Sequence, residues 1–488
     1  MLIWSLSAVV MAAQVELSPG DDLVARTEGL QPGDEVILND GFYRIQGTMN
    51  FSVSSTEDFP TIIRAAEGAA PVIELVATDG NYPGNIVQIS ESSWFIIQGI
   101  TFQGDVGWTD DTDNHGGVRI ANSSNVILRD MEVAQTGNTA VQIAGDSSDI
   151  TIERVHIHDT LAGHGVYVGC QDASCLTIGG TIDNNWIHNI GGEFTYGMFF
   201  AHGTQGVTIR DNIVYGVENR GVYLGSTEYG DLNIFEGNAV WNVSSIGLFV
   251  EGSALIRNNL IFNVDGTGLF SRDPERKTFT DQIISFNTIA NTTDWAVYLE
   301  DWYYASGMVF ANNAACNPIG YGWEYDIPVD LLDDTAIAPS ENVMRNNVVC
   351  GLVEGTEVLE DTSALVPGAG NGDFTNVENW DFYPANRDSS LVNAADPDGA
   401  TFIPEVDFSG YPRDGASPDV GAYEYFEDGN PGWPIQEGFK QFPELELSSD
   451  RASVTGGCCE DEGSGADAAL LAPLIGLGVL FRRRRDRR

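Results

Sequence analysis

The feature that most restricts the fold is a short repeated segment, in which two apolar residues flank a third residue and a glycine usually comes just before. It occurs nine times between Val87 and Leu299, at spacings of 31, 23, 25, 32, 24, 26, 21 and 28 residues. One short strand per unit at this period is typical of a solenoid, whose units pack only against their neighbours. The segments are residues 87–89, 118–120, 141–143, 166–168, 198–200, 222–224, 248–250, 269–271 and 297–299.

Each unit also contains a second short strand and a turn with Asn, as in residues 206–212 and 255–259. Asn adopts the left-handed backbone of tight turns, and stacked Asn side chains can form hydrogen bonds from coil to coil. We therefore predict an all-β fold, a right-handed, single-stranded parallel β-helix of about ten coils spaced about 4.8 Å apart. Leucine-rich repeats do not fit, because their Leu spacing is absent, and a propeller would need four strands per blade.

The charge balance limits the partners of the chain. Its 488 residues include 23 Lys+Arg and 71 Asp+Glu, for a formal net charge of −48. Such a surface repels nucleic acids and anionic lipids, so we expect neither as a partner. With 42% hydrophobic residues the chain can still bury a large core. An acidic polysaccharide could approach only through a local basic patch or a bound cation.

The beginning of the chain predicts export. Residues 2–13 are mostly apolar and a polar segment follows, so residues 1–13 are expected to be a signal peptide. No basic residue precedes the apolar stretch, which leaves a misassigned start or a buried first strand as alternatives. We expect the β-helix, with an N-terminal cap, over residues 14–426, of which 317–426 form a loop-rich closing segment.

The end of the chain has three parts. After an expected linker over residues 427–456, the segment 457–488 contains Cys458 and Cys459, a short apolar run and an arginine cluster. This order resembles the MYXO-CTERM sorting signal of myxobacteria. The resemblance implies processing by a sorting protease near Cys458 or Cys459 and delivery to the cell surface or outer envelope. A tail that binds nucleic acid is the alternative, which the apolar run disfavours.

Four further cysteines lie in the body of the chain. In an exported protein, Cys170 with Cys175 and Cys316 with Cys350 are plausible disulfides, each closing a local loop. A metal site is the alternative, but no CxxC or Cys-His spacing supports it.

Two parts of the body resemble known families. Residues 30–38, 60–65 and 95–100 resemble the opening coils of the polysaccharide-lyase group that contains chondroitinase B and alginate lyases. Residues 407–424 resemble the closing segment of secreted bacterial β-helix proteins. These resemblances imply a pectate-lyase-like fold and an extracellular polysaccharide as partner. The lyase group's catalytic Lys has no counterpart, because Lys277 is the only Lys in the central coils, so its catalytic roles cannot be transferred.

The middle residue of each repeated segment is expected to point outward, because side chains on a strand alternate between faces. In six consecutive coils this residue is aromatic. Such a row can stack on sugar rings, and we predict carbohydrate stacking; cover by the region after Cys316 is the alternative. The six residues are Tyr167, Phe199, Tyr223, Phe249, Phe270 and Tyr298.

Two residues further along the same strands, Glu251, Arg272 and Glu300 are expected to lie in adjacent coils. A β-elimination needs a base and a cation that neutralises a uronate carboxylate, and this group contains both residue types. A salt-bridge ladder without chemistry is the alternative.

Histidine is concentrated in one part of the chain, since all six lie between residues 115 and 202. Alignment of the turns places His158 beside His188, and we predict one acid–base or metal-binding group there. A structural ladder of stacked rings is the alternative, because the column continues as Tyr215, Trp241 and Phe262. The predicted group comprises His156, His158, His164, Tyr167, His188, Tyr196 and His202.

An acidic loop covers residues 105–114. Close carboxylates attract Ca²⁺, which makes calcium a candidate cofactor, and a solvated acidic loop is the alternative. The candidate ligands are Asp105, Asp110, Asp111, Asp113 and Asn114.

Together these features predict a secreted or surface-anchored monomer that binds an extracellular, uronate-containing polysaccharide. If it is an enzyme, a polysaccharide lyase that acts by β-elimination at the histidine and tyrosine group is the first hypothesis, ahead of the Glu251–Arg272–Glu300 ladder. An epimerase is the alternative enzyme class for the same group. The alternative function is adhesion or envelope structure without catalysis.

Overall fold

The computed structural model describes residues 12–76, 84–104, 116–226, 230–272, 281–300, 302, 307–316, 343–350, 365–396 and 403–442, and the backbone of 323–326 and 353–354. They all belong to one compact unit, Met1–Pro443. Within these residues no helix has the length and apolar character needed to cross a membrane.

Several predicted features lie outside the described residues. They are most of the signal peptide, the sorting tail with Cys458 and Cys459, and the acidic loop with Asp105, Asp110, Asp111, Asp113 and Asn114.

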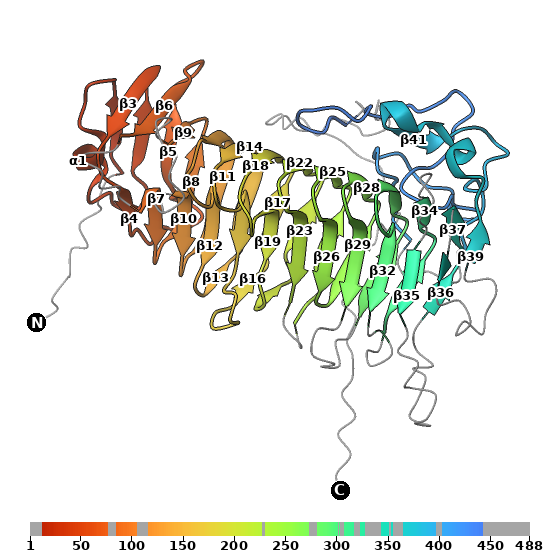
Figure 1. Ribbon diagram of the computed structural model, residues 1–488. Coiled ribbons are helices and arrows are strands. Elements are labelled where there is room, and N and C mark those ends of the chain that lie inside the picture. Colours follow the sequence, from red (N-terminus) through yellow and green to blue (C-terminus); the bar gives the residue numbers. More distant parts are fainter. Residues whose placement is uncertain are drawn as a thin grey trace, which may run out of the picture. The chain divides into compact units, whose positions relative to one another are not determined.

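The chain winds into stacked coils whose strands pair in parallel with the strand one coil further on (Figure 1). One side of the coils is a sheet of twelve strands. In order along the sheet they are β4 (Met49–Phe51), β7 (Asn85–Ser90), β10 (Gly116–Ala121), β12 (Val141–Ala144), β15 (Val166–Val168), β19 (Tyr196–Phe200), β23 (Arg220–Gly225), β26 (Ile246–Glu251), β29 (Thr267–Arg272), β32 (Val297–Glu300), β35 (Trp323–Asp326) and β38 (Val353–Glu354).

A sheet of 27 strands forms the other two sides of the coils. Its first side contains β1 (Gln14–Leu17), β2 (Glu35–Leu38), β5 (Thr61–Ala65), β8 (Ser93–Gln98), β13 (Ser147–Ser148), β16 (Thr177–Ile178), β17 (Thr181–Asp183), β20 (Thr204–Gln205), β21 (Thr208–Arg210), β24 (Asn233–Glu236), β27 (Ala254–Arg257), β30 (Gln282–Ser285), β33 (Val309–Ala311) and β36 (Val343–Arg345). Its second side contains β3 (Gly41–Ile45), β6 (Pro71–Leu75), β9 (Thr101–Gln103), β18 (Trp186–Ile190), β22 (Ile213–Val217), β25 (Ala239–Val243), β28 (Leu260–Val264), β31 (Thr288–Thr292), β34 (Ala314–Cys316), β37 (Asn347–Cys350) and β39 (Leu365–Pro367). The long strands β11 (Ser124–Ala134) and β14 (Thr151–Thr160) run through both sides.

The N-terminal end of the coils is closed by the helix α1 (Leu23–Thr27). Asp22 precedes it and its side chain accepts a hydrogen bond from the backbone N–H of Ala25, which stabilises the first turn. Leu23 is buried in the main core, so the helix covers apolar side chains of the first coils.

The nine strands predicted from the repeat are all present, as β7, β10, β12, β15, β19, β23, β26, β29 and β32. Their flanking apolar residues point inward as expected: Val118, Val141 and Val166, for example, lie in register in adjacent coils and are at most 1% exposed. A continuous column of such residues forms the core, so each coil is stabilised mainly by the coils above and below it.

A buried ladder of asparagines lies at the corner between the two sides of the larger sheet. Each Asn donates its Nδ2–H to the Oδ1 of the next Asn at 2.8–3.1 Å, and that same Oδ1 accepts the backbone N–H of the first residue. The residue just before each ladder Asn has a positive φ between 49° and 68°, which turns the corner. The ladder residues are Asn185, Asn212, Asn238, Asn259, Asn287, Asn313 and Asn347.

The C-terminal segment folds back along the outer surface of the second side, near β22, β25 and β28 (Figure 1). Its elements are η5 (Gly370–Asp373), β40 (Phe374–Asn376), η6 (Val377–Asn379) and β41 (Asp381–Pro384). Its core residues Phe382 and Tyr423 share one apolar cluster with outward residues of the coils such as Trp241 and Phe262. We call this surface, from Ile213 to Cys350, the covered face.

Polar contacts attach this segment to the corner residues of successive coils. The guanidinium of Arg413 donates to Asn258 Oδ1 at 2.8 Å, and Lys440 Nζ donates to Asp211 Oδ1 at 2.7 Å and to the Gly237 carbonyl at 2.8 Å. Lys440 is 2% exposed. Residues 427–442, expected to begin a linker, therefore belong to the packed body, because Lys440 needs the carboxylate and carbonyl that the corners present.

Both predicted disulfides are present. Cys170 is bonded to Cys175, and Cys316 to Cys350. The second pair joins residues that lie in register on β34 and β37, so it connects two adjacent coils under the C-terminal segment.

Replacement of a ladder residue tests this fold. We expect Asn238→Ala to lower the free energy of unfolding by about 3 kcal/mol, because two donors of Asn212 and the Ile209 carbonyl lose their buried partner. Denaturant unfolding measures this change. The control Asn50→Ala removes an exposed side chain on β4 and should change the free energy by less than about 0.5 kcal/mol. Equal effects of the two substitutions would contradict the role of the ladder.

Candidate functional site

The outer side of the twelve-stranded sheet contains the predicted aromatic row, and we call it the aromatic face. The register places the row in consecutive coils, from Tyr167 on β15 to Tyr298 on β32. In the coils before it, the same column continues as Gln142, Arg119 and Gln88. The predicted outward column is therefore confirmed residue by residue.

The rings of the row pack against one another, face to face in three pairs and edge to face between Tyr223 and Phe249. Ring centroids are 4.6 Å apart for Phe199 and Tyr223 and 4.9 Å apart for Phe249 and Phe270. As a result Phe199, Tyr223 and Phe249 are only 9%, 4% and 4% exposed. These three side chains have no open ring face for a sugar, which corrects their predicted role as stacking platforms. Tyr167 at one end of the row, with Phe270 and Tyr298 at the other, is only partly buried.

A second group of side chains lies beside the row, near the beginning of its strands. The His164 ring contacts Tyr167, Tyr196 and Phe199, and His164 Nδ1 accepts the backbone N–H of Tyr196 at 3.1 Å. Arg220 donates to the Tyr196 hydroxyl, and its guanidinium lies 5.5 Å from the Phe249 ring centre. Arg220 Nε is buried and has no hydrogen-bond partner within the described residues.

A polar relay lies at the other end of the same strands. The Tyr223 hydroxyl donates to Glu251 Oε2 at 2.7 Å and is 3.1 Å from His202 Nε2. Arg272 Nε donates to the other oxygen of Glu251. Burial and the Glu251 carboxylate raise the pKa of Tyr223 far above 10, so the phenol stays protonated. We call His202, Tyr223, Glu251 and Arg272 the relay.

The predicted Glu251–Arg272–Glu300 ladder is present in the structure. Arg272 forms an ion pair with Glu251 and lies in register with Glu300. The guanidinium of Arg272 is also 5.0 Å from the Phe249 ring centre. Arg220 and Arg272 thus approach the same ring.

Two arginines of the aromatic face lack the ion pair that most arginines of the larger sheet form. Within the described ranges, Arg119 and Arg220 form no ion pair, whereas on the larger sheet Arg154 pairs with Asp130 and four further arginines pair likewise. Arg119 donates instead to the neutral amides of Gln142 and Gln88, at 3.1 and 3.3 Å. Within the part of the chain that the structure describes, the aromatic face therefore holds positive charge without a carboxylate partner.

A hollow of about 500 Å³ lies next to Arg119. Gln142, Tyr167 and Asp146 line it, and the Cys170–Cys175 disulfide forms part of its wall. The open end of the aromatic row at Tyr167 faces this hollow, so a ligand there could contact a guanidinium and a phenol together.

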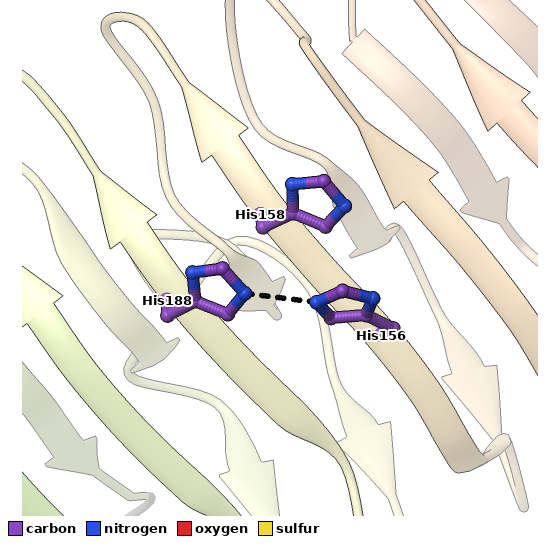
Figure 2. Close-up of side chains that lie close together, drawn as sticks. All are labelled: His156, His158 and His188. Carbon is purple, nitrogen blue, oxygen red and sulfur yellow. Dashed lines mark hydrogen bonds between the residues drawn. The ribbon is translucent and has the colours of Figure 1, made fainter. Parts of the chain in front are cut away.

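The five histidines that the structure describes lie in two separate places. His156 and His158 on β14 and His188 on β18 lie together on the larger sheet (Figure 2). His164 and His202 lie on the aromatic face. The expected single group is therefore wrong, because the chain turns corners before β15 and before β19. These corners bring His164, Tyr167, Tyr196 and His202 to the twelve-stranded sheet, whereas His188 on β18 belongs to the larger sheet.

We call His156, His158 and His188 the histidine cluster. His156 Nε2 and His188 Nε2 are 2.8 Å apart, and the rings of His158 and His188 stack with centroids 5.2 Å apart. One ligand atom from each of the three lies within 4.8 Å of the others, so these residues could hold a metal ion. The column continues as Tyr215, Trp241 and Phe262, as predicted.

The surroundings of the cluster shift the pKa values of its three histidines in different directions. Burial lowers the pKa of His158, but its hydrogen bonds with Glu132 and Asp159 together raise that pKa above its ordinary value. Burial and the two neighbouring imidazoles lower the pKa of His156 to about 4. Burial and His158 also lower the pKa of His188.

Sequence reasoning missed several residues that shape these sites. Arg220 was not proposed, although a basic residue just before a repeat strand could have been noticed in a chain with so few bases. Glu132 and Asp159 flank the histidine cluster from two coils, and only the register shows that Glu132 lies beside His156. Phe439, which contacts His156, comes from a segment that sequence analysis assigned to a linker.

Comparison with known proteins supports the architecture. A family model described as "Right handed beta helix region" matches residues 72–234. The chain is a right-handed parallel β-helix. No curated protein matches this β-helix.

Solved structures that resemble this β-helix include three from carbohydrate-active proteins. The A-module of mannuronan C-5 epimerase AlgE6 from Azotobacter vinelandii is 16% identical, over 65% of this chain and 85% of that one, with a TM-score of 0.51. The pectate lyase Pel9A is 13% identical over 86% and 98% of the two chains, with a TM-score of 0.49. An alginate lyase from Paenibacillus sp. str. FPU-7 is 14% identical over 59% and 93%, with a TM-score of 0.39. At these identities the likeness concerns the fold.

The environment of His164 predicts a pH dependence. Burial lowers the pKa of His164 to about 4, whereas the unfolded chain keeps a value near 6.5. At a pH between 4 and 6.5, His164 is protonated in the unfolded state but not in the folded state. This residue therefore lowers the free energy of unfolding as the pH falls from 6.5 towards 4. We expect the wild-type protein to lose about 1–2 kcal/mol relative to His164→Gln between pH 7 and pH 5. Parallel pH profiles of the two unfolding free energies would contradict this expectation.

Proposed function

We propose that the protein binds an extracellular, uronate-containing polysaccharide along the aromatic face and cleaves it by β-elimination. The observation that supports this most directly is the pair Arg119 and Arg220, whose guanidinium groups have no carboxylate partner within the described residues. In a chain with a net charge of −48, such arginines are the groups that an anionic ligand can reach without displacing a partner.

The spacing of these arginines fits an extended ligand. Arg119 lies on β10 and Arg220 on β23, four coil steps further along the sheet. At about 4.8 Å per step they are roughly 19 Å apart along the coils, which is the scale of several sugar residues rather than one. The hollow beside Arg119 and the open ring of Tyr167 lie between them. A polymer with a carboxylate on successive units could contact both arginines at once.

The relay provides groups for the elimination itself. Because the Tyr223 hydroxyl donates to Glu251, it can accept the Nε2–H of His202, which leaves Nδ1 of His202 unprotonated. In the proposed reaction Arg272, which lies in the relay, neutralises the uronate carboxylate and His202 Nδ1 removes the proton at C5. The C4–O bond breaks as the C4–C5 double bond forms, and the imidazolium returns its proton to the leaving oxygen. Tyr223 and Glu251 position His202.

One observation favours the second candidate function, non-catalytic adhesion or envelope structure. The central rings of the aromatic row are buried against one another, and the Glu251–Arg272 ion pair resembles a stabilising ladder between coils. A surface protein needs only such a rigid face and a few arginines to bind an acidic polymer. The two candidates agree on the binding face and differ in whether His202 removes a proton.

An assay with purified protein separates the candidates. The protein is incubated with alginate, pectate and glycosaminoglycans, with and without Ca²⁺, while the absorbance of unsaturated uronate and binding are measured. We expect His202→Gln to lower turnover about 10²–10⁴-fold with binding retained. Arg220→Gln should weaken binding and turnover together, because it removes an ionic contact to the ligand.

Arg154→Gln is the matched control, since Arg154 lies on the larger sheet and already pairs with Asp130. Binding and turnover should not change in this variant. Binding without unsaturated product on every substrate would exclude the lyase and leave the adhesive role. Absence of binding to all of the acidic polymers would contradict both.

We also propose that the protein is exported and retained at the cell surface. The apolar start, the tail with Cys458 and Cys459 and the two disulfides support this, since disulfides persist in oxidising compartments. Mass spectrometry of the protein isolated from its own cells should show loss of about the first 13 residues and processing near Cys458 or Cys459. Recovery of an intact chain from the cytoplasm would contradict export.

A further inference from the structure

The histidine cluster lies on the larger sheet, away from the proposed polysaccharide face. His156 and His158 are two residues apart on β14 and so project from the same side of the strand. His188 on the adjacent coil lies in register with His158, and Trp186 lies in register with His156. Because both strands are fixed by parallel backbone pairing and the Asn ladder, the three imidazoles are held by a rigid scaffold.

The distances within the cluster match those of a small ion's coordination sphere. The ligand atoms of the three rings lie within 4.8 Å of one another, and the two Nε2 atoms of His156 and His188 are 2.8 Å apart. A tetrahedral Zn²⁺ with bonds of about 2.0–2.1 Å needs nitrogen atoms about 3.3 Å apart, so shifts of about an ångström would suffice. Three imidazoles suit zinc, copper or nickel and not Ca²⁺, which takes oxygen ligands.

The neighbours of the cluster are the kind that support a bound cation. Glu132 Oε1 is 2.9 Å from His158 Nε2, and Asp159 Oδ2 is 2.9 Å from His158 Nδ1. Carboxylates that hold a histidine in this way orient it and offset the charge of an ion. To bind the ion, His158 would exchange the hydrogen bond of one ring nitrogen for a bond to the metal. The other ring nitrogen would keep its hydrogen bond with a carboxylate.

A ladder of stacked rings alone does not account for these contacts. Further along the column Tyr215 and Trp241 stack with centroids 4.7 Å apart, and any flat ring would serve there. In the cluster, by contrast, two imidazole nitrogens face each other and two carboxylates bracket the third ring. All three histidines are only partly buried, so solvent and ions can reach them.

We propose that His156, His158 and His188 form a binding site for one divalent transition-metal ion, with Zn²⁺ the best match, and with a coordination position left for water. The ion links two adjacent coils. It also strengthens the end of the covered face, because Phe439 of the C-terminal segment contacts both His156 and Trp186. This site is independent of the polysaccharide proposal, since it shares no residue with the aromatic face.

The test uses the full chain after treatment with a chelator. Zn²⁺ alone is titrated by calorimetry, metal content is measured by mass spectrometry after dialysis, and Co²⁺ is used as a probe of coordination by its visible spectrum. We expect one Zn²⁺ per chain, a tetrahedral Co²⁺ spectrum and a raised melting temperature with Zn²⁺. Ca²⁺ should reproduce none of these.

His188→Asn should weaken Zn²⁺ binding by about 100-fold or more, and the matched control His202→Gln, which removes a histidine outside the cluster, should bind as the wild type does. Circular dichroism checks that both variants are folded. Absence of stoichiometric Zn²⁺ binding to the unaltered chain overturns the proposal whatever the variants do. Unchanged binding in His188→Asn overturns it as well.

Discussion

The structure depends on one interaction repeated along the coils, the parallel pairing of backbones, which the buried Asn ladder holds in register from Asn185 to Asn347. Each ladder Asn satisfies a backbone donor, a backbone carbonyl and the next side chain, all away from water. A slip of one residue would leave these groups unpaired at several coils. Since the register is fixed in this way, a side chain's place in the repeat determines its column and its neighbours.

The columns give the surfaces of the β-helix different properties. On the larger sheet the column that contains His158 and His188 becomes aromatic and then apolar towards Cys350, and the C-terminal segment packs on its part within the covered face. The segment is attached by Arg413 and Lys440 to the corner residues. On the aromatic face the rings stack along the coils and leave arginines at their edges. We therefore expect binding or catalytic sites where a column changes from aromatic or apolar residues to polar or charged ones.

The pairing of charges explains why few surface sites can bind an anionic ligand. Most arginines of the coils are paired with carboxylates, which neutralises them within the protein. Arg119 and Arg220 contact amides and a phenol instead, and among the described residues no carboxylate compensates their charge. The histidine cluster has the opposite environment, with Glu132 and Asp159 beside it. The two sites thus suit ligands of opposite sign.

The sequence by itself determined the architecture, because a strand period, inward apolar pairs and turn asparagines are local patterns that recur at every coil. It predicted the nine central strands, the aromatic row, both disulfides and the His158–His188 neighbourhood. It could not assign His164 and His202 to a different sheet from His158, nor place Phe439 and Lys440 against distant coils. Only the tertiary structure decided these, because the corners set the sheet to which a residue belongs, and the C-terminal segment meets its partners across some 200 residues of chain.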